Sequence, residues 1–285
     1  MDKFVINGGR KLTGQINVSG SKNAALKALV AACLTDEKVI IDNIPLISDL
    51  FIMTDIIEEL GGEVSVLNHS ISVRMKDFKK TKIALERAAE VRTSAIFMAP
   101  LLARKKEAVI PNPGGCRIGA RPIDRTIEGL KQMGVDIEYK SSDGYFYMKV
   151  PNGLNGTDYT FKKSTHTGTE TLILSAVLAN GKTVLRNAAP EPEINELIEL
   201  LNKMGAKIKK QDDKTIEIIG VEKLFGTRFK IGPDRNEVVT LAIAAIITRG
   251  DIFIKDVNSS ALKSFIEKMK EIGGGVEGHV KAGHG

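Results

Sequence analysis

The residue types best suited to chemistry lie in one loop, PNPGGCRIGARPIDR, which spans residues 111–125. It places Cys116 among glycines, prolines and three arginines, and an amphipathic helical pattern follows directly. Glycines allow successive backbone N–H groups to point inward, and Pro122 suits the first position of a helix. Inward N–H groups, a helix N-terminus and arginine side chains together favour a bound phosphate or carboxylate.

Cys116 is therefore predicted to be a reactive thiol beside a bound anion, because positive potential favours the thiolate. The alternative is a glycine-rich connection with a buried structural cysteine, which would not need arginines on both sides. The other cysteine, Cys33, lies in the apolar run AALKALVAACL, where we expect a core role. Two cysteines make no disulfide framework.

Cations recur where helices are predicted to begin, at Lys22, Arg92 and Arg235. Each opposes the helix dipole by about 0.3–1 kcal/mol, so bound anions are expected to compensate. A solvated charge or a simple cap is the alternative for each residue, and an ion pair with Asp234 would explain Arg235, which is left out of the site. The corresponding third segment, STHTGT at 164–169, suits neutral hydrogen bonding to a base or sugar.

The elements that position these residues recur along the chain with a period of about 70 residues. A glycine closes a helical pattern four times, and a β-branched run ends in a polar residue four times. The positions are Gly61, Gly134, Gly205 and Gly273 for the first signal, and Asn43, Asn112, Asn187 and Asp256 for the second.

Each of the four units is predicted to contain a buried helix, a strand, a second amphipathic helix and an antiparallel strand pair. The buried helices are expected at 23–34, 93–103, 169–179 and 237–248, because these segments are apolar nearly all round. A typical second helix is 193–204, followed by a glycine cap and a strand pair around 211–213. The fold class is mixed α/β (α+β), with several units packed around shared helices.

Composition is that of a soluble globular protein, with 285 residues, 42% of them hydrophobic and 27% charged, and a net charge of +6. We expect a cytoplasmic protein, because no apolar run is long enough to span a membrane and the N-terminus lacks a signal-peptide pattern. Its paired lysines have little aromatic interleaving, which disfavours a nucleic-acid partner. Neither metal-ligand spacings nor nucleotide-binding glycine motifs occur, so no metal or cofactor is expected.

Four segments, SGSKNAA (19–25), PGGCRIGARP (113–122), NAAPEPE (187–193) and PDR (233–235), carry a resemblance. Together they resemble the enolpyruvyl transferase family, and within it the UDP-N-acetylglucosamine 1-carboxyvinyltransferases. The resemblance implies an inside-out α/β barrel of two lobes, each built from three βαβαββ units. It places a complete first lobe at 22–229 and a partial second lobe at 1–21 together with 230–285, so that four of six units are present.

The family transfers the enolpyruvyl group of phosphoenolpyruvate to the 3-hydroxyl of UDP-N-acetylglucosamine in peptidoglycan synthesis. The resemblance makes Cys116 the proton donor to C3 of phosphoenolpyruvate and the residue that fosfomycin alkylates. It implies that phosphoenolpyruvate is bound by Lys22, Asn23 and Arg121. It implies that the sugar nucleotide is bound by Arg92, Arg121, Pro122, Ile123, Asp124, Arg125, His166, Thr167 and Gly168.

The resemblance also places a catalytic aspartate, and further arginines around phosphoenolpyruvate, in the two remaining units. We therefore expect the chain alone to turn over slowly or not at all, because general base catalysis is commonly worth about 10²–10⁴-fold. The alternative function is a non-catalytic sugar-nucleotide-binding or partner subunit. Self-association through the open second lobe is a further expectation, because uncovered strand edges invite pairing.

Overall fold

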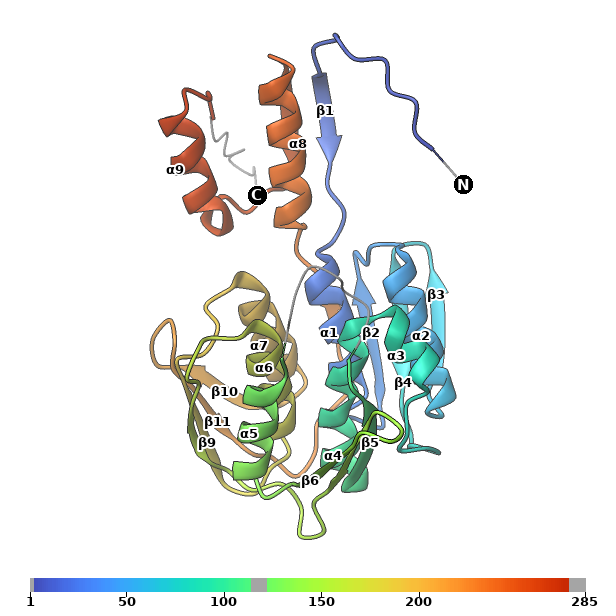
Figure 1. Ribbon diagram of the computed structural model, residues 1–285. Coiled ribbons are helices and arrows are strands. Elements are labelled where there is room, and N and C mark those ends of the chain that lie inside the picture. Colours follow the sequence, from blue (N-terminus) through green and yellow to red (C-terminus); the bar gives the residue numbers. More distant parts are fainter. Residues whose placement is uncertain (1–2, 114–121, 277–285) are drawn as a thin grey trace. The chain divides into compact units, whose positions relative to one another are not determined.

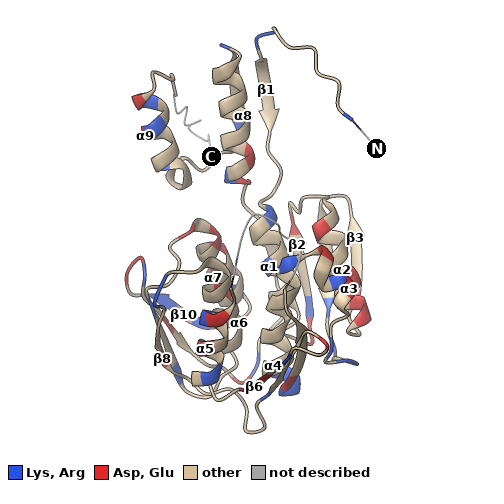
Figure 2. Cartoon of the chain, in the orientation of Figure 1, with Lys and Arg blue, Asp and Glu red and all other residues tan. Residues whose placement is uncertain are grey.

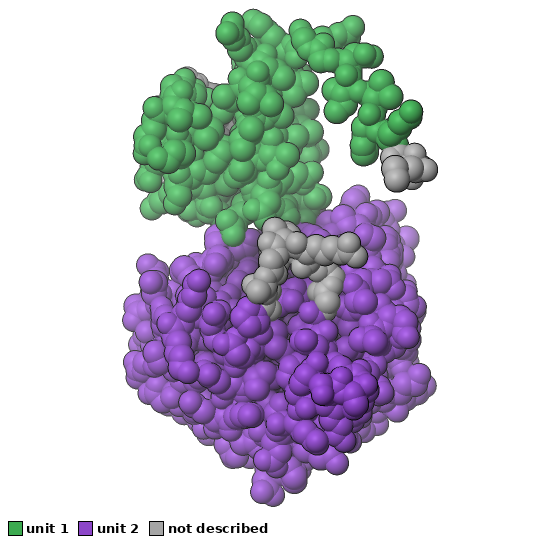
Figure 3. All heavy atoms as spheres, in the orientation of Figure 1, with its two compact units in different colours: residues 1–21, 233–285 green, residues 22–232 purple. Residues whose placement is uncertain are grey.

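The computed structural model describes residues 3–113 and 122–276. The chain forms two compact units, shown in Figure 3: unit 1 is Met1–Ser21 with Pro233–Gly285, and unit 2 is Lys22–Gly232. None of the helices in the described ranges combines the length and the apolar character needed to cross a membrane.

Unit 2 contains three sheets (Figure 1). The first has the order β12-β2-β4-β3, with bounds Arg228–Lys230, Lys38–Asp42, Ser70–Arg74 and Glu63–Leu67. The second is β5-β7-β6, with bounds Glu107–Pro111, Tyr145–Lys149 and Asp136–Lys140. The third is β10-β11-β9-β8, with bounds Lys207–Lys210, Ile216–Ile219, Lys182–Arg186 and Asp158–Thr160. Pairs β12–β2 and β8–β9 are parallel, and the other pairs in unit 2 are antiparallel.

The core of unit 2 is built around central helices that are buried on nearly all sides. These are α1 (Lys22–Ala32), the 3-10 turn η1 (Arg92–Phe97) with α4 (Met98–Lys105), and α6 (His166–Ala176). The helices α2 (Ser48–Glu59), α3 (Leu85–Glu90), α5 (Asp124–Gln132) and α7 (Pro192–Lys203) bury only part of their residues. This arrangement confirms the mixed α/β fold class.

The predicted elements of unit 2 are found close to their expected bounds, with one change of type. The segment 93–103 is not one α-helix, because Pro100 has no N–H to donate to the carbonyl of Ile96. Residues Arg92–Phe97 therefore form a 3-10 turn, and Pro100 lies in the first turn of α4. The strand pair β10–β11 lies where the turn at 211–213 predicts it.

Glycine is required at the four predicted helix ends. Gly61, Gly134, Gly205 and Gly273 have φ angles of 106°, 90°, 98° and 82°, in a region that side chains disfavour. Three of the polar strand-end residues, Asn43, Asn187 and Asp256, also have positive φ angles of 61°, 52° and 55°. Asn and Asp tolerate this conformation better than other residues with side chains.

Unit 1 contains β1 (Thr13–Asn17), paired in parallel with β13 (Asp251–Lys255), and three helical segments, α8 (Arg235–Ile247), η2 (Ser259–Leu262) and α9 (Lys263–Glu271). The prediction that the helix at 237–248 is buried is wrong, since α8 buries only Val238 and Ala245. Ile247 is 75% exposed. Within the described part of unit 1, this helix is accompanied by one two-stranded sheet, η2 and α9. The apolar surface of α8 extends all round the helix, and these elements do not cover all of it.

Candidate functional site

The central helices of unit 2 run in the same direction. The ends of all three meet at one cavity, which is lined by Leu34 just after α1, Ala103 of α4 and Leu178 just after α6. Near their ends, Arg104 of α4 donates to the carbonyl of Cys33, which follows α1. The N-termini of α1, α4 with η1, and α6 therefore lie at one end of unit 2, where the positive ends of three helix dipoles add.

The described candidate residues gather at helix beginnings. Lys22 and Asn23 open α1, Arg92 opens η1, Asp124 and Arg125 open α5, and the segment 166–168 opens α6. The Thr165 side chain caps α6 by accepting from the Gly168 N–H at 3.3 Å. Cys116 and Arg121 lie outside the described residues.

Lys22 forms an ion pair within unit 2. Its Nζ lies 2.6 Å from Asp49 Oδ2, and its side chain is 45% exposed. Asp49 stands in the first turn of α2, where a carboxylate is favoured. Asp49 thus supplies the negative charge that we expected a bound anion to supply, and an anionic ligand would compete with it for Lys22.

The residues on either side of the cysteine loop are anchored by backbone groups. Arg92 Nη1 donates to the carbonyl of Pro113 at 3.3 Å, which joins η1 to the start of the loop. After the loop, Tyr159 donates its hydroxyl to the carbonyl of Arg125 at 2.8 Å. Helix α5 begins at Asp124 with Ile123 as its N-cap, so the prediction that Pro122 occupies the first helical position is wrong by two residues.

Sequence reasoning missed two charged residues beneath this end of unit 2, Lys27 and Glu170. Glu170 lies between Lys27 Nζ at 3.4 Å and His166 Nε2 at 3.3 Å. Burial raises the pKa of Glu170 to about 7, although Lys27 lowers it. The signal that could have found them is a charged residue within each otherwise apolar helix.

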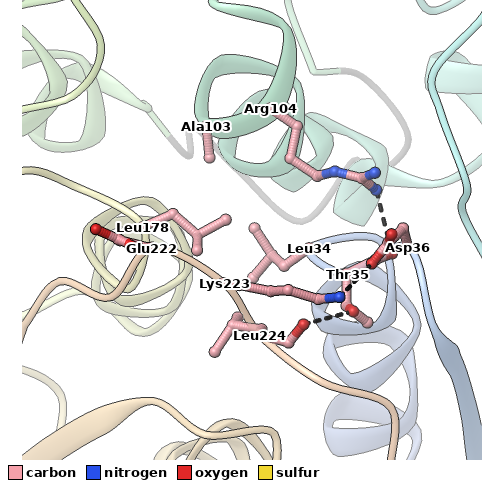
Figure 4. A pocket seen from close by; sticks show the side chains of 9 residues that line it. All are labelled: Leu34, Thr35, Asp36, Ala103, Arg104, Leu178, Glu222, Lys223 and Leu224. Atoms are coloured by element: carbon pink, nitrogen blue, oxygen red, sulfur yellow. Dashed lines mark hydrogen bonds and ion pairs between the residues drawn. The ribbon is translucent and has the colours of Figure 1, made fainter.

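A cavity of about 290 Å³ lies at the opposite end of unit 2, where the central helices finish (Figure 4). It is lined by residues such as Leu34, Ala103, Arg104 and Leu178. None of the candidate residues that the structure describes lines it. It is therefore distinct from the site that the sequence predicts.

Figure 2 shows residues of both charges on the elements of unit 2, with Lys and Arg among Asp and Glu. Within residues 3–113 and 122–276, no group of three or more His, Cys, Asp or Glu side chains could hold a metal ion. Among the described residues, the groups of the candidate site that could bind an anionic ligand are the N–H groups at helix N-termini and individual cationic side chains.

Comparisons with known proteins give consistent results. The family model of EPSP synthase (3-phosphoshikimate 1-carboxyvinyltransferase) matches residues 6–284. Proteins named UDP-N-acetylglucosamine 1-carboxyvinyltransferase from Koribacter versatilis and Acidobacterium capsulatum are 42% and 43% identical over 277 residues. These matches cover 96% of this chain and 63% of each relative. The chain thus spans less than two thirds of the length of these relatives.

Solved structures show the same fold. The enolpyruvyl transferase NikO from Streptomyces tendae has a TM-score of 0.82 at 19% identity, over 94% of this chain and 64% of its own. EPSP synthase from Acinetobacter baumannii has a TM-score of 0.73 at 18% identity, over 93% of this chain and 60% of its own. The inside-out α/β architecture is therefore common to this chain and these proteins.

Proposed function

The chain belongs to the EPSP synthase family of enolpyruvyl transferases, and we propose that it serves in the transfer of the enolpyruvyl group from phosphoenolpyruvate to UDP-N-acetylglucosamine. The observation that carries this proposal is 40–43% identity, over 96–97% of the chain, to proteins named for that reaction. In this proposal the reaction takes place in the cytoplasm, as the first committed step of peptidoglycan synthesis, and serves cell-wall growth, cell shape and division.

In the proposed reaction, the 3-hydroxyl oxygen of the sugar forms a bond to C2 of phosphoenolpyruvate and gives its proton to the catalytic base, which is proposed to lie outside this sequence. The Cys116 thiol gives a proton to C3, which produces a tetrahedral adduct. The Cys116 thiolate then takes a proton back from C3 while inorganic phosphate departs from C2, and the electron pair of the C–H bond restores the double bond. No cofactor is needed, because the substrates supply every bonding electron pair.

Anion recognition is assigned to the end of unit 2 where the central helices begin. Lys22 and Asn23 at the start of α1, with Arg121, are proposed to bind phosphoenolpyruvate. The sugar nucleotide is assigned to Arg92, Arg121, the segment 122–125 and the segment 166–168. Helix N-termini support this assignment, because their N–H groups and dipoles favour phosphates and carboxylates.

Unit 2 is proposed to be a complete lobe, and unit 1 to be part of a second lobe. The compact units divide between residues 232 and 233, three residues beyond the proposed boundary at 229. Because the proposed binding residues all belong to unit 2, we expect this lobe to retain affinity for the sugar nucleotide.

Calorimetry of the 285-residue chain with UDP-N-acetylglucosamine is expected to show binding with a Kd below about 1 mM. Arg92→Ala should raise this Kd about 10- to 100-fold, since a hydrogen bond to a charged group contributes about 1.5–3 kcal/mol. Arg74→Ala is the matched control, because Arg74 is an exposed arginine of β4 outside the proposed site. No heat at millimolar ligand, or an equal effect of both substitutions, would contradict the assignment.

A second candidate function is a non-catalytic sugar-nucleotide-binding or partner subunit, because the proposed sugar-nucleotide residues all belong to unit 2. Phosphate release with both substrates separates it from catalysis. We expect the 285-residue chain alone to turn over at least about a hundredfold more slowly than a relative of full length, because the proposed catalytic base lies outside this sequence. Turnover equal to that of the relative would refute this expectation.

A further inference from the structure

A buried charge pair joins α1 and α6 just below the end of unit 2 assigned to substrates. Lys27 is 4% exposed and Glu170 is fully buried. Lys27 Nζ lies 3.4 Å from Glu170 Oε2, and His166 Nε2 lies 3.3 Å from Glu170 Oε1. Each carboxylate oxygen therefore faces one nitrogen, and the two nitrogens come from different helices.

This pair is poorly explained by stability. Moving an ammonium and a carboxylate out of water costs several kcal/mol per ion, and apolar residues of similar volume are often as good or better. The neighbours along the two helices, such as Leu26, Leu29, Leu172 and Ile173, are buried and apolar. A charged pair at this place therefore fixes how α1 and α6 are arranged more than it raises the free energy of unfolding.

Further charges surround Glu170. Helix α7 contributes Glu193, which is 3% exposed, and Glu191 at its N-cap. Burial is the largest cause that raises the pKa of Glu170, Lys27 of α1 lowers it, and Glu193 and Glu191 raise it. Among these groups, Lys27 lowers the pKa of Glu170 and so favours its ionised form.

The pair lies about one helical turn from both proposed binding segments. Lys27 is five residues after Lys22 in α1, and Glu170 is four residues after His166 in α6. One turn of an α-helix has about 3.6 residues, so each charged residue stands beneath the first turn of its own helix. A contact between them links the segment proposed for phosphoenolpyruvate to a segment proposed for the sugar nucleotide.

We propose that Glu170, paired with Lys27, is a positioning residue that fixes His166 and the first turn of α6 relative to the first turn of α1. The inference rests on the function proposed above, and neither residue touches a substrate in it. The carboxylate attracts the His166 ring across 3.3 Å, and Lys27 attracts the same carboxylate across 3.4 Å.

The test compares Lys27→Gln, Glu170→Gln and the double variant in the 285-residue chain. Calorimetry with UDP-N-acetylglucosamine is expected to show a Kd raised about tenfold in each single variant, since each removes one partner of the attraction that holds the first turns of α1 and α6 together. The double variant should regain most of the affinity, because its two amides are neutral and can hydrogen-bond to each other. Glu199→Gln is the control, since Glu199 forms an exposed pair with Lys203 within α7.

A second measurement separates positioning from a general loss of stability. In the ligand-free chain, the imidazole ¹⁵N signals of His166, assigned through His166→Gln, are expected to shift in Lys27→Gln, because Lys27 acts on the ring through Glu170. His69, whose Nδ1 lies 2.9 Å from the Ile44 carbonyl, should give unchanged signals and serves as an internal reference. Should Glu170→Gln fail to fold by circular dichroism, Glu170→Asp, which keeps the charge but withdraws it, undergoes the same measurements.

The outcomes are distinguishable. Unchanged His166 signals in Lys27→Gln, or an unchanged Kd in Glu170→Gln, would overturn the positioning role. Absence of binding by the unaltered chain would overturn the proposed function instead, and the imidazole signals would still decide whether Lys27 and His166 are linked.

Discussion

Fosfomycin is expected to alkylate Cys116 and to leave Cys33 unmodified, with a difference in rate of at least about a hundredfold. The thiolate is the nucleophile that opens the epoxide. Cys33 is fully buried, and burial raises the pKa of its thiol to about 12 despite the nearby Arg104. Cys33 therefore stays a neutral thiol near neutral pH, and the epoxide could not reach its buried side chain.

Cys116 differs from Cys33 in its sequence surroundings, since Arg117 follows it directly and Arg121 comes five residues after it in the same glycine-rich segment. Peptide mass spectrometry after incubation with fosfomycin gives the modified residue directly. Cys116→Ser should abolish modification of the chain, and Cys33→Ala should leave it intact. Modification confined to Cys33 would remove the basis for assigning the proton-donor role to Cys116.

Replacement of Arg104 by alanine is expected to lower the free energy of unfolding of unit 2 by about 3 kcal/mol. Arg104 Nη1 donates to the carbonyls of Cys33, Thr35 and Met75 at 3.0, 3.1 and 2.7 Å, and Nη2 donates to the carbonyl of Lys76 at 2.8 Å. Alanine would leave these carbonyls without their donor. Urea denaturation followed by circular dichroism measures the loss.

Two variants make the Arg104 prediction specific. Arg104→Lys keeps the charge, but an ammonium lacks the planar fork that serves several carbonyls, so most of the loss should remain. Arg74→Ala removes an exposed arginine with one long bond to the Asp36 carbonyl at 3.4 Å, and should change the free energy by less than about 0.5 kcal/mol. Equal losses for Arg74→Ala and Arg104→Ala would show that the four carbonyl contacts of Arg104 stabilise the fold no more than the single contact of an exposed arginine does.

Much of the local structure could be predicted because it depends on short-range rules. The glycines at 61, 134, 205 and 273 adopt left-handed backbone conformations at helix ends, which a chain pattern alone reveals. The amphipathic α7 and the hairpin after it follow from apolar periodicity. The burial of α8 was predicted wrongly. An apolar sequence shows only that burial of the helix would be favourable, whereas the neighbouring elements decide whether the helix is buried.

The candidate site likewise has a part that the sequence predicts and a part that it does not. Residue types and spacing were enough to find the cysteine loop, the cations at helix beginnings and the resemblance to enolpyruvyl transferases. Only the tertiary structure decided that Asp49 pairs with Lys22 and that Glu170 stands between Lys27 and His166. Lys27 and Glu170 are 143 residues apart in the chain. The physical reason is that helical patterns describe each helix separately, whereas an ion pair between helices depends on how those helices pack.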